Sequence, residues 1–371
     1  MIDKTIMAKE VISKCRSSEG YFASADIYWG QYWLRDGAAS LGGLEDKKPA
    51  ARQLETFGAL QRKSGELPAI IYTPKSIFKI VPAGLKLIKE NPFLLKPVIE
   101  DLKFMVSGEK EKDSNESRYV FRNKPGSVVG FQRWAGDSEL FFVILIRELA
   151  KEGLISLKSY GEGVEKAVRF IEARQNMFWL IQGGGWMDAM KNYKGAIAFH
   201  ANLLLYRMYS LLGKTSEANA ISNTLNSALF YNENFGYYKS RPFEPVFDTL
   251  SHALAIKWGL IPANRIEMAV KNLEKVFTKF GCRNINPAYG YKDCEQPPYR
   301  YQNSACWPFV DAKVIIALKD LGFDEMAKKR FLVLSDQKGF NEWYNPFTGE
   351  PKGSKDQLWS AAGYLEAKSV F

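Results

Sequence analysis

The chain has 371 residues, and its 51 Lys and Arg against 41 Asp and Glu give a net charge of +10. A hydrophobic content of 46% is enough for a large core, which excludes global disorder. The longest apolar run, residues 140–146, is far shorter than the roughly 20 residues of a membrane-spanning helix. We therefore expect a cytoplasmic protein without an integral membrane segment. Because acidic residues interleave with the basic ones, we expect no nucleic-acid partner.

Cysteine and histidine are scarce in this chain. The four cysteines have no CxxC spacing, and there are two histidines, so a zinc site built on these ligands is not expected. The sequence also has no GxSxG, Walker or Rossmann fingerprint. We therefore expect neither a metal nor an organic cofactor. Acid–base chemistry, if present, is expected to depend on carboxylates.

Helical spacing of apolar residues recurs along most of the chain, whereas no run of alternating residues predicts a strand. Twelve helices are predicted outside the segment 65–134. They are expected near residues 3–16, 32–44, 47–63, 136–151, 160–178, 196–212, 215–229, 247–259, 264–279, 305–320, 323–336 and 355–370.

Short and long connections alternate between these predicted helices. The long ones are expected at residues 17–31, 64–135, 179–195, 230–246, 280–304 and 337–354. Six helical hairpins arranged in a ring, with the long loops at one end, would give this alternation. We therefore predict a single all-α domain over residues 1–371, an (α/α)6 toroid. An open helical solenoid would need an internal repeat, and none is found.

The segment 65–134 interrupts this pattern and is predicted to be a helical insertion. It is apolar and basic and is broken by four prolines between residues 74 and 97. A helical excursion packed on the barrel is the simplest interpretation. A lid over the loop end, a contact in a homo-oligomer and an anchor on an anionic surface are the alternatives.

Aromatic residues gather in the long loops, although loops are normally polar. Flat apolar rings beside carboxylates suit sugars, because pyranose faces stack on aromatic rings while hydroxyl groups seek charged acceptors. The alternative is that the rings pack the loops onto the barrel. Seven of the nine tryptophans lie in these loops or in the first turn of the next helix, namely Trp29, Trp33, Trp134, Trp179, Trp186, Trp307 and Trp343.

Two loop carboxylates lie in aromatic surroundings. Asp188 stands in GGGWMDAM, and Glu342 stands in GFNEWYN. Glycoside hydrolysis needs two carboxyl groups that flank the scissile bond, and an apolar setting helps one of them to remain protonated. The alternatives are a helix N-cap for Asp188 and a surface carboxylate for Glu342.

A series of motifs resembles the six-hairpin glycosidases. YWLRDGAASLGGL, GDSELFFVILIREL and GGGWMDAM are similar, in this order, to elements of the amylo-α-1,6-glucosidases that debranch glycogen. FDTLSHALAIKWGLI and YQNSACWPFVDAKVIIAL resemble later elements of these enzymes. FNEWYNPFTGEPKGSKDQLWSAAGYLEAK is also similar to the end of neutral and alkaline invertases, and glucoamylase-like proteins share the toroid. The resemblance extends over nearly the whole chain outside the segment 65–134.

This resemblance implies an inverting, exo-acting glycoside hydrolase that removes a terminal sugar, with α-linked glucose the best fit. Asp188 would be the general acid and Glu342 the general base that activates water. Arg35 and Asp36 would bind hydroxyl groups of the terminal sugar, although a structural ion pair is the alternative for both. Asp137 would be a further sugar contact and is the second choice for the general acid. The tryptophans expected to form the pocket walls are Trp33, Trp186 and Trp307.

Other functions stay open on the sequence alone. An invertase-like enzyme acting on sucrose keeps the same fold, and so does a non-catalytic carbohydrate-binding barrel. Unsaturated-glucuronide hydrolases and sugar 2-epimerases also use α/α barrels, but the epimerases rely on pairs of histidines, which argues against them here. His200 stands after Asp188 where a small or polar residue is expected. It is interpreted either as a core histidine of its helix or as a pocket residue.

Overall fold

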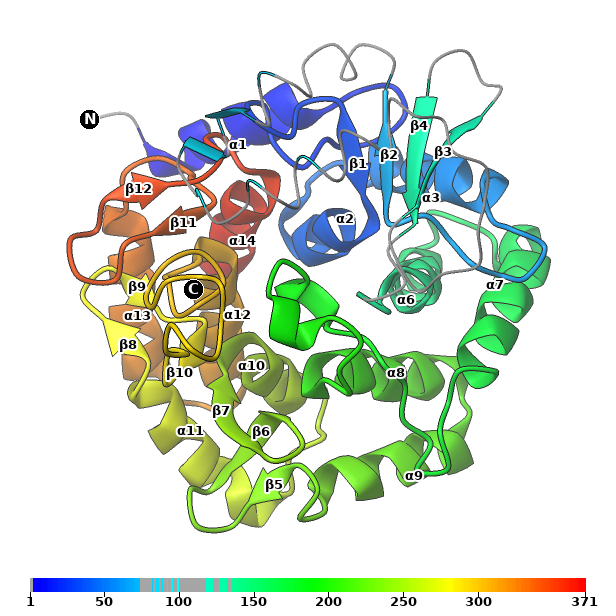
Figure 1. Ribbon diagram of the computed structural model, residues 1–371. Helices are drawn as coiled ribbons and strands as arrows, with labels where there is room; N and C mark the ends of the chain where they lie inside the picture. Colours follow the sequence, from blue (N-terminus) through cyan, green and yellow to red (C-terminus); the bar gives the residue numbers. More distant parts are fainter. Residues whose placement is uncertain are drawn as a thin grey trace.

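The computed structural model describes residues 3–73, 118–122, 127–131 and 135–371, together with scattered positions between 82 and 99. In this part of the chain, twelve α-helices form two concentric rings (Figure 1). All twelve predicted helices are present, and the (α/α)6 toroid is confirmed. The helices are α1 (Lys4–Cys15), α2 (Leu34–Ser40), α3 (Lys48–Ala59), α6 (Ser138–Lys151), α7 (Leu157–Glu172), α8 (Phe199–Leu212), α9 (Thr215–Asn226), α10 (Thr249–Lys257), α11 (Ile266–Glu274), α12 (Pro308–Asp320), α13 (Asp324–Asp336) and α14 (Leu358–Lys368).

Burial separates the inner helices from the outer ones. In α12, which is inner, every residue from Pro308 to Leu318 is buried. In α13, which follows it on the outside, only Ala327, Arg330 and Leu334 are buried. A helix that is apolar all round is surrounded by protein, whereas an outer helix needs a single apolar stripe. The inner ring consists of α2, α6, α8, α10, α12 and α14, and each of these helices contacts the next.

The ring closes where α14 packs against both α1 and α2. The short 3₁₀ turn Leu41–Gly43 continues α2 and also packs against α14. A Cβ atom on Gly43 would lie 1.8 Å from the carbonyl oxygen of Ala362, so the two backbones approach as closely as only glycine permits. The two glycines at positions 42 and 43 therefore allow the close packing of this turn against α14, where the ring closes.

Short antiparallel strands accompany the helices, and the sequence did not predict them. β1 (Gln31–Trp33), β2 (Ile70–Tyr72), β4 (Ser127–Phe131) and β3 (Arg118–Arg122) form one four-stranded sheet in this order. A second sheet has the order β10 (Ile285–Asn286), β7 (Glu244–Asp248), β6 (Tyr237–Arg241) and β5 (Tyr231–Asn232). Two further pairs join β8 (Phe277–Thr278) to β9 (Gly281–Cys282) and β11 (Trp343–Tyr344) to β12 (Pro351–Lys352).

The first sheet corrects the expectation of a purely helical insertion. Three of its strands, β2, β3 and β4, lie between residues 65 and 134, where the described ends of the segment pair with each other and with β1. Much of residues 74–134 lies outside the described residues, including Trp134. The proposed roles as lid, oligomer contact or surface anchor are therefore not tested.

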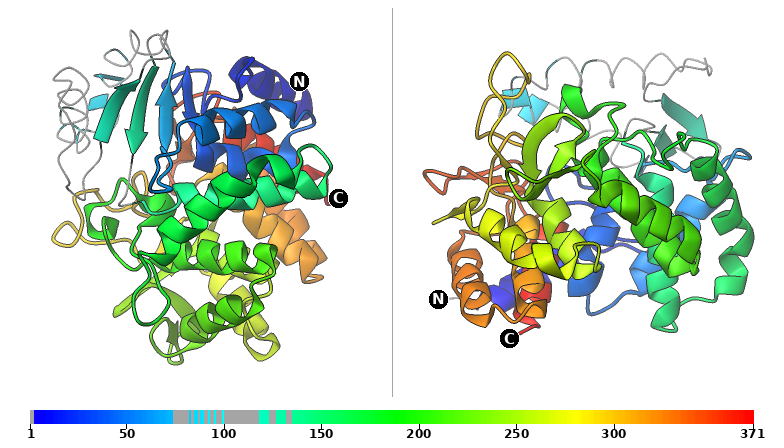
Figure 2. Two further views of the ribbon diagram at one scale, coloured as in Figure 1. Left: turned by 90° about the vertical axis from the view of Figure 1, so that its right-hand side faces the viewer. Right: turned by 90° about the horizontal axis from the view of Figure 1, so that it is seen from below.

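The long loops lie at one end of the ring. Figure 2 shows the first sheet and the loop 280–304 at this end, and both chain termini at the opposite end. Residues that follow each long loop therefore lie at the same end of the ring. No helix among the described residues is long and apolar enough to cross a membrane.

Candidate active site

Arg35 is the central cation at the loop end of the ring. It lies in the first turn of α2, directly after β1. Its Nε donates to Asp137 Oδ2 at 2.7 Å, and its Nη1 lies 3.1 Å from Asp188 Oδ2. Burial lowers the pKa of Arg35, but the charges of Asp137 and Asp188 outweigh this effect and raise it. One guanidinium thus joins carboxylates from two distant segments of the chain.

The two carboxylates that Arg35 contacts differ in exposure. The side chain of Asp137, which begins α6, is 2% exposed, whereas the side chain of Asp188 is 15% exposed. Asp188 follows the 3₁₀ turn Gly185–Met187, and Gln302 Nε2 lies 3.4 Å from its Oδ1. A substrate can therefore reach Asp188 more easily than Asp137.

Glu342 lies on another loop and is held by two tyrosines. The hydroxyl groups of Tyr28 and Tyr301 both donate to Glu342 Oε1 at 3.2 Å, and the backbone N–H of Ser354 donates to Oε2 at 3.0 Å. Burial, and then the charge of Glu342, raise the pKa of both tyrosines well above the ordinary value. Tyr301 has φ 48°, a left-handed conformation that a side chain rarely adopts. These contacts fix the Glu342 carboxylate and keep both tyrosines as proton donors.

Asp36 is a fourth carboxyl group of this site and a protonated one at neutral pH. Burial raises its pKa to about 8, while the charge of Arg35 opposes the shift and those of Glu342 and Asp188 add to it. The nearby α2 N-terminus favours a negative charge by roughly 0.3–1 kcal/mol, which is too little to offset the burial. Gln357 Nε2 lies 3.5 Å from Asp36 Oδ1. Asp36 therefore lies within electrostatic reach of both Asp188 and Glu342.

The three tryptophans expected as pocket walls occupy different positions. Trp33 is half-buried, and its Nε1 donates to Gln31 Oε1 at 3.2 Å. Trp186 and Trp307 are buried and pack edge to face with their centroids 5.6 Å apart. Trp307 Nε1 donates to the carbonyl oxygen of Tyr301, and the carbonyl oxygen of Trp186 accepts from Gln302, so both buried tryptophans contact residues of the site. The role of the three tryptophans as pocket walls stays a prediction.

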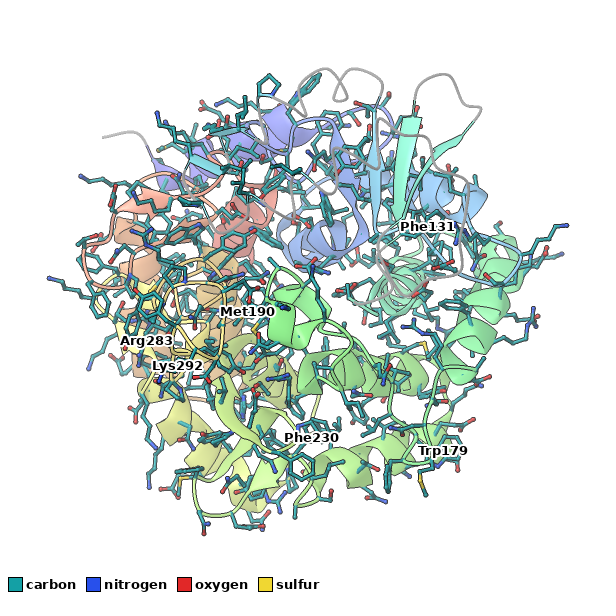
Figure 3. The ribbon with its side chains drawn as sticks, in the orientation of Figure 1. Phe131, Trp179, Met190, Phe230, Arg283 and Lys292 are labelled. Atoms are coloured by element: carbon teal, nitrogen blue, oxygen red, sulfur yellow. The ribbon has the colours of Figure 1, made fainter. Side chains whose placement is uncertain are left out.

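Trp179, one of the loop tryptophans, lies away from the centre of the ring. Its side chain is 48% exposed, and Figure 3 shows it at the periphery of the molecule near α9. Met190, in contrast, lies near the middle of the ring and belongs to the loop that carries Asp188. This loop therefore begins at the outer rim and crosses to the centre of the toroid.

Sequence reasoning missed the polar residues that hold the carboxylates. Tyr301 and Gln302 open the motif YQNSACWPFVDAKVIIAL, and Gln357 lies in the last motif, but no role was assigned to them there. For Tyr28, the available signal was its position in the long loop 17–31. Gln302 also donates to the carbonyl oxygen of Trp186 at 2.7 Å and accepts from the N–H of Ala189 at 3.1 Å. It thus fixes the backbone on both sides of Asp188.

The arrangement suits the transfer of protons between a bound polyhydroxyl compound and water. The guanidinium of Arg35 contacts the partly exposed Asp188 carboxylate. The protonated carboxyl group of Asp36 is affected by the charges of Arg35, Asp188 and the hydrogen-bonded Glu342. In the described part of the chain, no group of three or more His, Cys, Asp or Glu is placed to hold a metal ion. The chemistry available to these side chains is acid–base catalysis by carboxyl groups.

Comparisons with known proteins give a consistent result. Residues 182–360 match the family described as the mannosylglycerate hydrolase MGH1-like glycoside hydrolase domain. A curated mannosylglycerate hydrolase of Thermus thermophilus is 37% identical over 68 residues, which are 18% of this chain. The matched segment spans 16% of the length of that relative.

Solved structures extend the likeness to the whole chain. The GH63 mannosylglycerate hydrolase from Thermus thermophilus, in complex with glucose, has a TM-score of 0.66 at 16% identity, covering 98% of this chain and 99% of its own. The same enzyme with Tris and D-glycerate has a TM-score of 0.64 at 15% identity, with the same coverage. A wild-type glycosidase has a TM-score of 0.64 at 15% identity, covering 99% and 96%. The chain thus has the six-hairpin glycosidase-type fold, and its residues 182–360 are similar to the glycoside hydrolase domain of the mannosylglycerate hydrolases.

Proposed function

We propose that the chain is an inverting, exo-acting glycoside hydrolase that releases a terminal α-linked hexose from a short glycoside. The observation that carries the proposal is the pair of Asp188 and Glu342 at the loop end of the ring. One is partly exposed and is held by Arg35, and the other is buried and accepts two tyrosine hydroxyl groups. Both carboxylates act electrostatically on Asp36, which supports a shared site for the two.

In this mechanism Asp188 protonates the glycosidic oxygen while Glu342 takes a proton from the attacking water. Inversion needs the two carboxyl groups roughly 6.5–9.5 Å apart so that water fits between Glu342 and the sugar. Tyr28 and Tyr301 hold Glu342 in one orientation, as a base that must face the water requires. The exposure of Asp188 supports it over Asp137 as the acid.

The remaining polar groups bind the terminal sugar in this proposal. The Arg35 guanidinium and the neutral Asp36 carboxyl offer several donors and one acceptor for neighbouring hydroxyl groups. Asp137 fixes Arg35 from the buried side. Trp33 is the half-buried ring on which a sugar face can stack.

The substrate is proposed to be small. The similar proteins are named mannosylglycerate hydrolases, and their crystals hold glucose or D-glycerate. These names favour a hexose on a small partner group over a branch of glycogen, so the debranching activity expected from the sequence motifs is not carried forward. Glucose stays the first choice of hexose, and mannose is the second.

The test measures hexose release from mannosylglycerate, glucosylglycerate, isomaltose, panose, maltotriose, sucrose and trehalose. Proton NMR of the first product identifies the anomer, and an inverted anomer is expected. Asp188→Asn and Asp137→Asn are measured beside the wild type. The proposal expects Asp188→Asn to lose activity on glycosides but to retain most of it on the corresponding glycosyl fluoride, whose leaving group needs no acid.

Other outcomes decide against parts of the proposal. Retention of the anomer would contradict the roles of both carboxylates. If Asp137→Asn, and not Asp188→Asn, loses activity on glycosides but retains it on the glycosyl fluoride, Asp137 is the general acid. Binding of oligosaccharide without any product would favour a non-catalytic barrel.

A further inference from the structure

His200 lies beneath the loop that carries Asp188. It stands in the first turn of α8 and is 2% exposed. Gly185 packs against its imidazole ring so closely that a Cβ atom on this glycine would lie 2.4 Å from His200 Cδ2. Gly185 also has φ +62°, which a side chain would strain. The GlyGlyGly sequence before Trp186 therefore lets the loop rest directly on the ring.

A chain of hydrogen bonds fixes the orientation of this ring. Ser251 Oγ donates to Asp248 Oδ2 at 2.5 Å, and His200 Nδ1 lies 3.1 Å from Ser251 Oγ. A hydroxyl group has one proton, and here it is given to the Asp248 carboxylate. Ser251 must therefore accept from His200, which places the histidine proton on Nδ1.

The second nitrogen of His200 is then an acceptor without a proton. His200 Nε2 is buried and has no hydrogen-bond partner among the described residues. Burial, and then the nearby charge of Arg35, lower the pKa of His200 to about 3, so the ring is neutral. A neutral ring matters here, since an imidazolium would repel the guanidinium that holds Asp137 and Asp188.

We propose that the Asp248–Ser251–His200 chain positions the acid of the proposed reaction. It holds a neutral imidazole, with Nε2 unprotonated, against Gly185 and beside Arg35. The loop with Asp188 thereby keeps its place, and the Arg35 guanidinium stays on the two carboxylates. His200 is a positioning residue in this scheme, because the loop separates it from any substrate. The inference rests on the proposed function of Asp188.

His252 supplies a matched control. It is the other histidine of the chain, it is buried in α10 like Ser251, and its pKa is lowered by burial to about 3 as well. Its Nδ1 donates to the carbonyl oxygen of Asp248 at 2.6 Å, and its Nε2 accepts from the N–H of Tyr238 at 3.0 Å. Its ring stacks on Phe247 with centroids 3.8 Å apart. It is as buried as His200 but is tied to β6 and β7 instead of the acid loop.

The experiment compares Ser251→Ala, His200→Phe and the control His252→Phe on two substrates, a glycoside from the panel above and the matching glycosyl fluoride. Asp188→Asn is the reference for loss of the acid. For Ser251→Ala and His200→Phe we expect kcat on the glycoside to fall by about 10–100-fold, with KM and the rate on the fluoride changing by less than about 3-fold. His252→Phe removes a bond to the backbone of Asp248 but leaves the bonds from the Asp248 carboxylate to Ser251 and from Ser251 to His200, so we expect it to change both substrates equally, through the amount of folded protein.

An equal loss on both substrates for Ser251→Ala, or no loss on either, overturns the positioning role. If wild type hydrolyses neither substrate, or if Asp188→Asn shows no preference for the fluoride, it is the proposed function that fails.

Nitrogen-15 NMR of the wild-type protein tests the chain of hydrogen bonds without relying on activity. At about pH 7, far above the pKa values of both histidines, we expect both imidazole rings of the wild type to carry their proton on Nδ1. The signals that are missing from the spectrum of His252→Phe belong to His252, which assigns the others to His200. A proton on Nε2 of His200 would overturn the inference.

Discussion

Two groups of charged side chains in this molecule differ in their ratio of cations to carboxyl groups. The loop-end cluster consists of Arg35, Asp36, Asp137, Asp188 and Glu342, so one cation faces four carboxyl groups. The outer pair, Asp311 of α12 and Arg330 of α13, has one charge of each sign at 2.8 Å. The outer pair is deeply buried, the loop-end cluster is buried except for the partly exposed Asp188, and both groups join separate elements of the fold.

The outer pair has the features of a structural contact. Asp311 Oδ2 also accepts from the N–H of Cys282 at 2.9 Å, and Arg330 Nη1 donates to the carbonyl oxygen of Thr278 at 2.8 Å. These contacts tie β8 and β9 to the α12–α13 hairpin. The loop-end cluster instead keeps more carboxyl groups than its one guanidinium can neutralise. Such an excess costs stability, and it is characteristic of a site that moves protons.

The largest expected difference between the two groups is in catalysis. Glu342→Gln removes the proposed base while the amide still accepts from Tyr28 and Tyr301. We expect kcat to fall roughly 10³-fold, as is usual when a base is lost. The midpoint of thermal unfolding should change little, which circular dichroism can check. A variant that retains more than a tenth of the wild-type kcat would contradict the assigned role.

The outer pair is expected to show the reverse pattern. Asp311→Asn leaves the Arg330 guanidinium buried without a counter-charge, and we expect the free energy of unfolding to fall by about 3 kcal/mol. Urea unfolding measures this loss. The turnover per folded molecule should equal that of the wild type. A fall in kcat comparable to that of Glu342→Gln would mean that the balance of positive and negative groups does not distinguish a structural charge group from a catalytic one in this protein.

A smaller effect is expected at Asp36, and its sign depends on pH. Because burial raises the pKa of Asp36 from the ordinary 3.8 to about 8, the native state keeps a proton that the unfolded state releases. Between these two values stability therefore falls as the pH rises, and Asp36→Asn removes this loss. We expect the stability of Asp36→Asn relative to the wild type to rise by up to about 1.4 kcal/mol per pH unit between these two values, and the two proteins to be equally stable below the lower one.

Thermal unfolding of both proteins at several pH values measures the Asp36 effect. The same substitution should lower activity, because the proposed sugar contact changes from a carboxyl to an amide group. A stability difference that does not vary with pH would contradict the protonated state of Asp36.

The helices could be predicted because each carries its own periodic pattern. The apolar residues of α7 and α11, for example, form a stripe on each helix. The alternation of short and long loops predicted that the helical hairpins form a ring. The strands could not be predicted in this way. Several, such as β5 and β11, have only two residues, and β1 pairs with β2 across many intervening residues. Alternation over two or three residues carries no signal, since pairing partners far along the chain decide whether a strand forms.

The site could be predicted in part. Arg35, Asp36, Asp137, Asp188 and Glu342 stand in motifs whose order resembles known glycosidases, and the fold brings Arg35, Asp137 and Asp188 into contact. Tyr28 was missed because it stands in no motif, and Tyr301 was missed because its motif does not indicate which carboxylate its hydroxyl group contacts. Whether an aromatic ring lines a pocket or backs it, as Trp307 does, depends on the packing of the loop above it. That packing is a property of the folded ring and is not encoded in a short window of sequence.

The closure of the ring through α14 has a consequence for how the protein folds as it is synthesised. Helix α1 is made before the other helices of the ring, and its buried residues Ala8, Val11 and Cys15 form an apolar stripe. Its partner α14 is made after the other helices of the ring, so while these are synthesised the stripe lacks this native partner and is open to chaperones or to aggregation. The contact between α1 and α14 joins residues far apart in the sequence, and it also completes the toroid. We therefore expect the docking of α14 onto α1 to be the slow, rate-limiting step of folding.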